Sequence, residues 1–227
     1  VCSSDLKQVM TPAAVATHLG LSALVSRGVS SLKDYGPYVC VIATEIKPIS
    51  YGTNGGTDYG YANGACAMAA SLSKMAAYSS VTAKPLYNVQ ALRYAPTRTQ
   101  QEALANKGVN SVVLNFNKIA VFGDGLTFAA SGSDYSRLST KRVVDEAANV
   151  VRQACQKFVG EPSTIQMRTS METSISAALR GMQLLGALLA SDFNVTYVPA
   201  ENKAIVDLII TPAFELKSIQ VQIAVNI

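Results

Sequence analysis

The feature that most constrains the fold is an apolar stripe at helical spacing in the second half of the chain. Val143, Ala147 and Val151 recur every four residues, and Phe158 continues the same stripe. The opposite side of this stretch is polar, with Arg142, Glu146, Asn149, Gln153 and Gln156. This pattern predicts an amphipathic helix with one face in a core and the other in water.

A second long helix is predicted directly downstream. Its apolar residues are spaced by three and four: Met171, Ile175, Ala178, Met182, Leu185 and Leu189. Thr169 and Glu172 have the spacing of a capping box, which predicts the start of this helix. Strands are predicted at residues 193–198, 204–211 and 216–225. We expect the two helices to pack together on one side of the sheet.

The first half of the chain alternates helices, strands and glycine-rich loops. Helices are predicted at residues 11–27, 65–78 and 97–106, the last of them ending at Gly108. Strands are predicted at 38–46 and 109–116, and Asn117 and Lys118 form a two-residue turn into a strand at 119–122. The fold class is therefore α/β (α+β), with mixed sheets flanked by long amphipathic helices.

Composition excludes several classes of protein. Hydrophobic residues make up 49% and charged residues 15%, which is too apolar for a disordered chain. The net charge of +4 comes from scattered Lys and Arg residues, so no nucleic-acid groove and no direct nucleic-acid partner are predicted. No apolar run reaches the roughly 18 to 20 residues that span a bilayer, so no membrane insertion is expected. With so few charges, the surface must consist largely of Ser, Thr, Asn, Gln and Gly. Such a surface suits a subunit that packs against neighbours, or it reflects simple compositional drift.

The four cysteines do not have the spacing of a metal site. Cys2, Cys40, Cys66 and Cys155 lie far apart, and none forms a Cys-x-x-Cys pair. We interpret the last three as small buried residues of a protein in a reducing compartment.

Residues 1–6 are expected to be an artefact. Val-Cys-Ser-Ser-Asp-Leu is what a common sequencing adapter encodes when it is read in frame. This predicts that the protein begins upstream of the sequence shown, and no function is assigned to Cys2 or Asp5.

The sequence shows little catalytic chemistry. His18 is the single histidine, and a triad needs a base of this type. Cys66, at the start of an alanine-rich helix, is the candidate nucleophile, but a thiol in such a helix is more often buried. Glycine spacing fits no phosphate loop, and the carboxylates are scattered, so no cofactor and no metal are predicted. Asp124, between two glycines, is interpreted as a turn residue. We therefore expect that the protein is not an enzyme. The alternatives are a small α/β hydrolase-like enzyme that uses Cys66 and His18, or a monomeric α/β binding module.

Several short stretches occur in an order that carries a family resemblance. They are Asn-Lys-Gly-Val-Asn at 106–110, Ile-Ala-Val-Phe-Gly-Asp at 119–124, Leu-Ser-Thr-Lys-Arg-Val at 138–143, Phe-Val-Gly-Glu-Pro at 158–162, Leu-Leu-Ala-Ser-Asp-Phe at 188–193 and Ile-Thr-Pro at 210–212. This set resembles the C-terminal domain of contractile phage tail sheath proteins, or of the sheath of a related contractile injection system. Gly125 and Leu126 stand where the family has Arg-Thr. An ordinary α/β domain that shares this order by chance is the alternative.

The resemblance implies a domain organisation. Tyr-Ala-Asn-Gly-Ala at 61–65 resembles the loop-to-helix entry of the sheath's subtilisin-like core. Residues 7–105 would be the truncated C-terminal part of that core, and residues 106–227 the sheath C-terminal domain. The implied function is a structural subunit that polymerises around a tail tube and contracts to drive the tube through a cell envelope. It implies a virion tail location, with assembly in the cytoplasm of a host bacterium.

The resemblance also implies partners and contact residues. The partners would be other sheath subunits in a helical homopolymer, the tail tube protein, the baseplate and the tail terminator. Strand exchange between subunits would use the terminal strand, with Leu216, Ile219, Val221, Ile223, Val225 and Ile227. Tube-facing candidates are the basic residues of the first long helix: Lys141, Arg142, Arg152 and Lys157. The alternative is a solvated helix face with i,i+4 pairs, Lys141 with Asp145 and Arg142 with Glu146.

Overall fold

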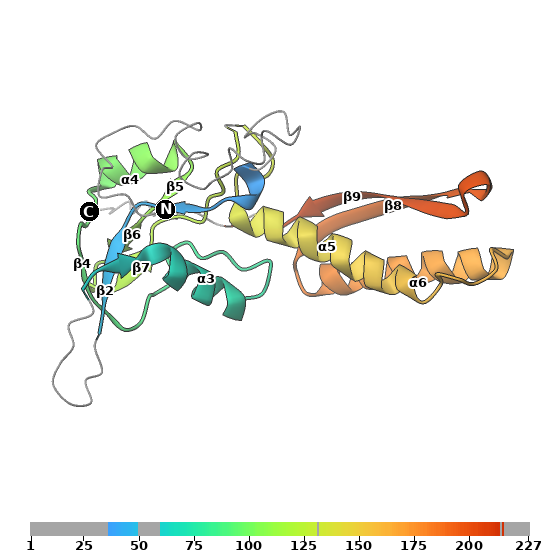
Figure 1. Cartoon of the computed structure of the whole chain (residues 1–227), viewed down its shortest axis with the longest axis horizontal. Helices are drawn as coiled ribbons and strands as arrows, with labels where there is room; N and C mark the ends of the chain where they lie inside the picture. The colour runs from blue at the N-terminus through green and yellow to red at the C-terminus, as the bar shows by residue number, and fades with distance from the viewer. Residues whose placement is uncertain (1–35, 50–59, 131, 214, 216–227) are drawn as a thin grey trace, which may run out of the picture. The chain divides into compact units, whose positions relative to one another are not determined.

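The structure is a computed structural model that describes residues 36–49, 60–130, 132–213 and 215. It divides into two compact units, Val1–Lys141 and Arg142–Ile227 (Figure 1). The first unit contains η2 (Gly36–Tyr38), β1 (Val41–Ile42), β2 (Glu45–Pro48), β3 (Ala62–Asn63), α3 (Gly64–Lys74), β4 (Val89–Leu92), α4 (Arg98–Ala105), β5 (Val109–Asn110), β6 (Val112–Leu114) and β7 (Ala120–Phe122). Helix α5 (Leu138–Gln156) begins in this unit and continues into the second, which adds α6 (Ile165–Leu184), β8 (Leu188–Val198), η3 (Pro199–Glu201) and β9 (Lys203–Pro212).

The first unit is built from small sheets around one apolar cluster. Strand β1 pairs with β5 in parallel, β2 lies between β3 and β4 in an antiparallel sheet, and β6 and β7 form a hairpin. Its core includes Ile42, Met68, Val81, Val112 and Phe122. Together with the second unit, this confirms the predicted mixed α+β architecture.

The strand predicted at 38–46 is wrong as one element, because the chain changes sheets within it. Tyr38 ends a 3-10 turn, β1 pairs with β5, and β2 joins a different sheet. The buried Thr44 lies at the change and bonds across to β6, where its Oγ1 accepts from Val112 N at 3.0 Å. A side chain thus provides the bond that a continuous strand would have made with its backbone.

The strand predicted at 109–116 also divides, after Asn110. The Asn110 side chain is fully buried; its Nδ2 donates to the carbonyl oxygens of Leu126 (2.8 Å) and Val41 (3.1 Å), and its Oδ1 accepts from Leu126 N (2.7 Å). The hairpin that follows is confirmed, but its turn is longer than two residues. Asn115 N bonds to Ile119 O, and Lys118 has a left-handed φ of 59°.

The predicted helices of the first unit are present with altered ends. Helix α4 begins with a capping box of Thr97 and Gln100 and is followed by Gly108, whose φ of 71° is left-handed. A Cβ on Gly108 would lie 3.0 Å from Thr127 O, a tight contact, and the left-handed φ also favours glycine there. Helix α3 ends at Lys74 rather than near residue 78, because Met75 is extended.

The second unit confirms the predicted pair of long helices, but the second helix starts earlier than expected. Thr164 is its N-cap, with Oγ1 accepting from Met167 N at 3.2 Å. Thr169 is therefore not a cap: its hydroxyl donates to Ile165 O inside the helix. Leu189, predicted as helical, lies in β8. The predicted helix at 11–27, loop residues 51–59 and the strand at 216–225 fall outside the described residues.

Candidate functional site

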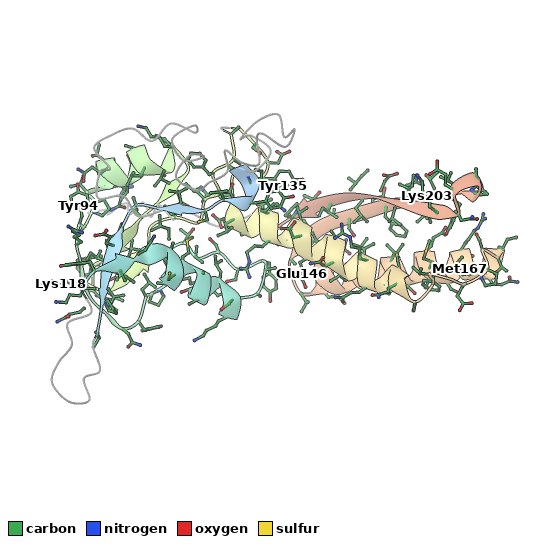
Figure 2. All side chains as sticks on the ribbon, viewed as in Figure 1. Tyr94, Lys118, Tyr135, Glu146, Met167 and Lys203 are labelled. Carbon is green, nitrogen blue, oxygen red and sulfur yellow. The ribbon has the colours of Figure 1, made fainter. Side chains whose placement is uncertain are left out.

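The second unit is a two-stranded sheet covered on one face by two helices (Figure 1). Strands β8 and β9 pair in antiparallel register from Leu188 opposite Pro212 to Val198 opposite Lys203. The chain reverses through η3, and Asn202 takes the left-handed conformation that this tight connection needs. Figure 2 labels Lys203 at this tip and Met167 in α6 at the same end of the unit.

The inner face of the hairpin forms a core with the helices. Val143, Ala147 and Val151 of α5 pack with Met171, Ile175, Leu179 and Met182 of α6, and the inward residues of the hairpin are Phe193, Val195, Tyr197, Val206, Leu208 and Ile210. The buried members of this cluster are nearly inaccessible to water, and Ala147 and Ile175 are completely so. The apolar stripes that predicted the two helices are therefore also the helix faces that pack against the sheet.

Both edges of the hairpin lack a further strand among the described residues. Strand β8 pairs with β9 alone, and β9 with β8 alone. An edge of ten or so residues presents a row of backbone donors and acceptors that a strand of another chain can pair with. The residues predicted for such pairing, Leu216, Ile219, Val221, Ile223, Val225 and Ile227, lie outside the described part of the chain.

The four basic residues predicted to face a tube have different environments. Lys141 is 6% exposed, and its Nζ lies 4.1 Å from the centre of the Tyr38 ring and 6.0 Å from that of Tyr135. Its charge is therefore directed at aromatic rings of the first unit rather than at a partner. This burial does not fit a tube-facing role for Lys141.

The other three basic residues lie on or beyond the polar side of α5. Arg142 is half-buried, and burial lowers its pKa from the ordinary value while the nearby Glu146 opposes the change. Arg152 is exposed, and Lys157, just past the helix, is exposed with its Nζ 5.0 Å from the centre of the Phe158 ring. These three remain candidates for a weak electrostatic contact.

A cavity of about 590 Å³ lies between the α5–α6 connection and the hairpin tip. Its lining includes Phe158, Met167, Tyr197 and Arg168, whose guanidinium carbon lies 4.3 Å from the centre of the Tyr197 ring. Tyr197 Oη donates to Glu172 Oε1 at 3.3 Å; burial, followed by the charge of Glu172 and this bond, raises the pKa of Tyr197. Sequence reasoning missed this group: Tyr197 lies in a predicted strand, but Arg168 precedes Thr169, where the second helix was predicted to start.

The residues considered for catalysis are not brought together. Cys66 is exposed on α3, and His18 lies outside the described residues. Within the described ranges, no group of three or more His, Cys, Asp or Glu side chains could hold a metal ion. None of the described helices is long and apolar enough to cross a membrane.

Asp124 is more than the turn residue that the sequence predicted. It is buried, and its Oδ1 lies 2.5 Å from Arg137 Nη1 and accepts from Gly125 N at 3.0 Å. The pair joins the loop after β7 to the start of α5. Its role is structural.

In comparisons of sequence, no protein-family model and no curated protein matches the chain. In comparisons of structure, the fold is that of the sheath proteins of contractile injection systems and tails. One match is the anti-feeding prophage helical sheath in its contracted state, with a TM-score of 0.72 and 16% identity over 99% of this chain and 60% of that chain.

Two further matches show the same fold. The sheath complex of the extracellular contractile injection system PVC, also contracted, has a TM-score of 0.69 and 14% identity over 87% of this chain and 60% of that chain. The sheath tail protein of Listeria innocua has a TM-score of 0.63 and 13% identity over 77% of this chain and 42% of that chain. The chain thus spans 42% to 60% of the length of these three matched chains.

Proposed function

We propose that this chain is part of a structural subunit of a contractile tail sheath, which polymerises around a tail tube and contracts to drive the tube through a cell envelope. The observation that carries the proposal is the β8–β9 hairpin, backed by α5 and α6 and without a further strand at either edge among the described residues. A subunit built to join a polymer needs such an edge, whereas an isolated monomer has reason to cover it. The sheath-type fold supports the same function.

The proposal includes the way in which subunits connect. Strands contributed by neighbouring copies would add to the outer edges of β8 and β9, so that backbone bonds link the subunits. Residues 216–227 alternate apolar and polar side chains and would supply one of these strands. Residues 106–227 would form the sheath C-terminal domain, although β5 to β7 pack within the first unit.

The proposal also includes the remaining partners and the location. Arg142, Arg152 and Lys157 would face the tail tube, while the baseplate and the tail terminator would meet the two ends of the sheath. The sheath would assemble in the cytoplasm of a host bacterium and would form part of a tail that serves DNA ejection or another injection. Neither direct nucleic-acid contact nor membrane insertion is part of this function, and the subunit is proposed to have no catalytic activity.

Electron microscopy of the full-length protein tests the function directly. We expect tubular polymers in negative stain, and we expect deletion of residues 222–227 to abolish them while the protein remains folded by circular dichroism. Intact tubes from the truncated protein would contradict strand exchange through this segment. A protein that stays monomeric at high concentration would indicate a binding module, and hydrolase activity lost with Cys66→Ser or His18→Ala would indicate an enzyme.

A further inference from the structure

The outer face of the β8–β9 hairpin combines exposed apolar residues with negative charge. Ile205 and Ile209 lie on this face, and Ile209 is 71% exposed. Asp192 is opposite Ile209, and Asp207 is opposite Asn194, so the two aspartates occupy diagonal positions, which lie about 7–8 Å apart along the backbone of such a pair. Lys203, at the tip, forms an ion pair with Glu201 of the turn.

This face is unsuited to contact with a copy of itself. Two such faces would bring four aspartates together, and like charges across an interface oppose association. An exposed isoleucine pair beside two carboxylates is instead suited to a partner surface that is apolar and carries a cation.

The loop of the β6–β7 hairpin in the first unit has this complementary composition. Phe116 is completely exposed at its end, flanked by the exposed side chains of Leu114 and Ile119. Tyr87, which is 77% exposed, is placed beside the loop because Leu86 N bonds to Ala120 O at 2.7 Å. Lys118 is the one charged residue in segments 85–88 and 114–119 and is labelled in Figure 2.

We propose that the β6–β7 loop of one copy of this chain docks on the outer face of the β8–β9 hairpin of a second copy. Phe116 would lie against Ile205 and Ile209, and Lys118 would approach Asp192 and Asp207. The two surfaces differ, so the contact is heterologous. Each copy presents its β6–β7 loop to one neighbour and its hairpin face to another, and repetition of this contact builds an open helical polymer. The contact uses the face of the hairpin, so both edges remain available for strands.

This inference rests on the proposed function, since it names a contact of the same polymer. Charge exchange in the full-length protein tests it. Lys118→Glu and Asp207→Lys should each raise the critical concentration for polymerisation by about tenfold or more, because each places like charges across the contact. The double variant should return it to within about threefold of wild type, because the pair is restored in reverse. Asp134→Lys, at an exposed position of the first unit, is the matched control and should have no effect.

Photo-crosslinking identifies the partner surface. Phe116 is replaced by benzoylphenylalanine in the full-length protein, and copies labelled with ¹⁵N are mixed with unlabelled copies before irradiation. We expect crosslinks between copies to peptides covering 190–196 and 205–211. Crosslinks within one copy, or to residues 158–167 beside the cavity, would overturn the inference.

The two failures are distinguishable. A wild-type protein that never polymerises overturns the proposed function and this contact together. Normal polymers that are indifferent to both charge changes overturn the contact alone. Circular dichroism and thermal unfolding of each variant establish that a loss of polymer is not a loss of fold, which is expected because Lys118 and Asp207 are both exposed.

Discussion

The Asp124 carboxylate and the Arg137 guanidinium form an ion pair whose oxygen and nitrogen lie 2.5 Å apart, with the aspartate almost completely buried. The pair holds the first turn of α5 against the loop that follows β7, where Leu138 N also bonds to Gly125 O at 3.0 Å. The ion pair thus connects the start of α5 to the end of the β6–β7 hairpin.

Removing one partner of this pair should destabilise the protein strongly. Arg137→Met leaves the Asp124 carboxylate buried without its counter-ion, and we expect a loss of about 2–3 kcal/mol in the free energy of unfolding. The double variant Asp124→Asn with Arg137→Met should lose less than the sum of the single changes. Urea denaturation measures all three, and additive losses would contradict the coupling.

Substitution of Asn110 should destabilise the protein as strongly as substitution of Arg137. Asn110→Ala deletes the amide oxygen and nitrogen that satisfy Leu126 N, Leu126 O and Val41 O in the core, and buried backbone groups without partners are costly. We expect a loss of about 3 kcal/mol. Denaturation with urea, read through a probe in the first unit, measures it. Asn117→Ala, in the exposed hairpin loop, is the control and should be close to wild type.

The core of the second unit offers a matched pair of isoleucines. Ile175 is completely buried in α6, whereas Ile165 at the start of the same helix is 80% exposed. Ile175→Ala should cost about 2–5 kcal/mol in unfolding free energy through lost burial and a cavity. Ile165→Ala should change little, and equal effects of the two substitutions in chemical denaturation would show that the packing of α6 is different from that described.

Cys40 should make stability depend on alkaline pH. Burial raises the pKa of its thiol from 9.0 to about 11, although the Asn110 amide, which donates to the sulfur at 3.2 Å, lowers it in part. The unfolded chain therefore releases this proton before the folded protein does. The stabilisation is complete below pH 9 and is lost between pH 9 and about pH 11.

The measurement compares wild type with Cys40→Ala across this pH range. The difference between their unfolding free energies should shrink by roughly 2 kcal/mol from pH 8.5 to pH 11. A thiol reagent at pH 8 should also modify Cys66 well before Cys40, since Cys66 is exposed. A constant difference, or equal reactivity of the two thiols, would contradict the burial of Cys40.

Charge reversal tests the proposed tube contact. Arg152→Glu should weaken binding of the full-length protein to a tail tube, and the loss should diminish as salt is added because the contact is exposed. Gln153→Glu, one residue along the same helix, is the control for an added charge. Co-sedimentation with tubes measures both, and unchanged binding by Arg152→Glu would favour a solvated helix face.

Local patterns predicted the helices, and non-local bonds decided the strands. The stripe through Val143, Ala147 and Val151 identified α5, because the helical spacing of apolar residues can be recognised without knowing which residues pack against them. Thr44 and Asn110 divide two predicted strands, and both do so by bonding to residues far away in the sequence. No window of neighbouring residues contains that information.

The candidate site was predictable only in part. The inward residues of β8 and β9 alternate in the sequence, so the sheet and its helical cover followed from periodicity. The burial of Lys141 did not, because Tyr38 and Tyr135 approach it from other segments. The start of α6 was misplaced because Thr164 and Thr169 are equally good caps by residue type.

Because the β8–β9 sheet has only two strands among the described residues, the stability of the second unit should depend on whether further strands add to it. A hairpin of two strands is marginal by itself, and here its inner face packs against α5 and α6. Any strand that adds to an edge would therefore contribute unfolding free energy as well as a connection. If the chain polymerises as proposed, its thermal resistance would rise with protein concentration, the unassembled subunit would be the more protease-sensitive form, and the polymer would act as a stabilising ligand.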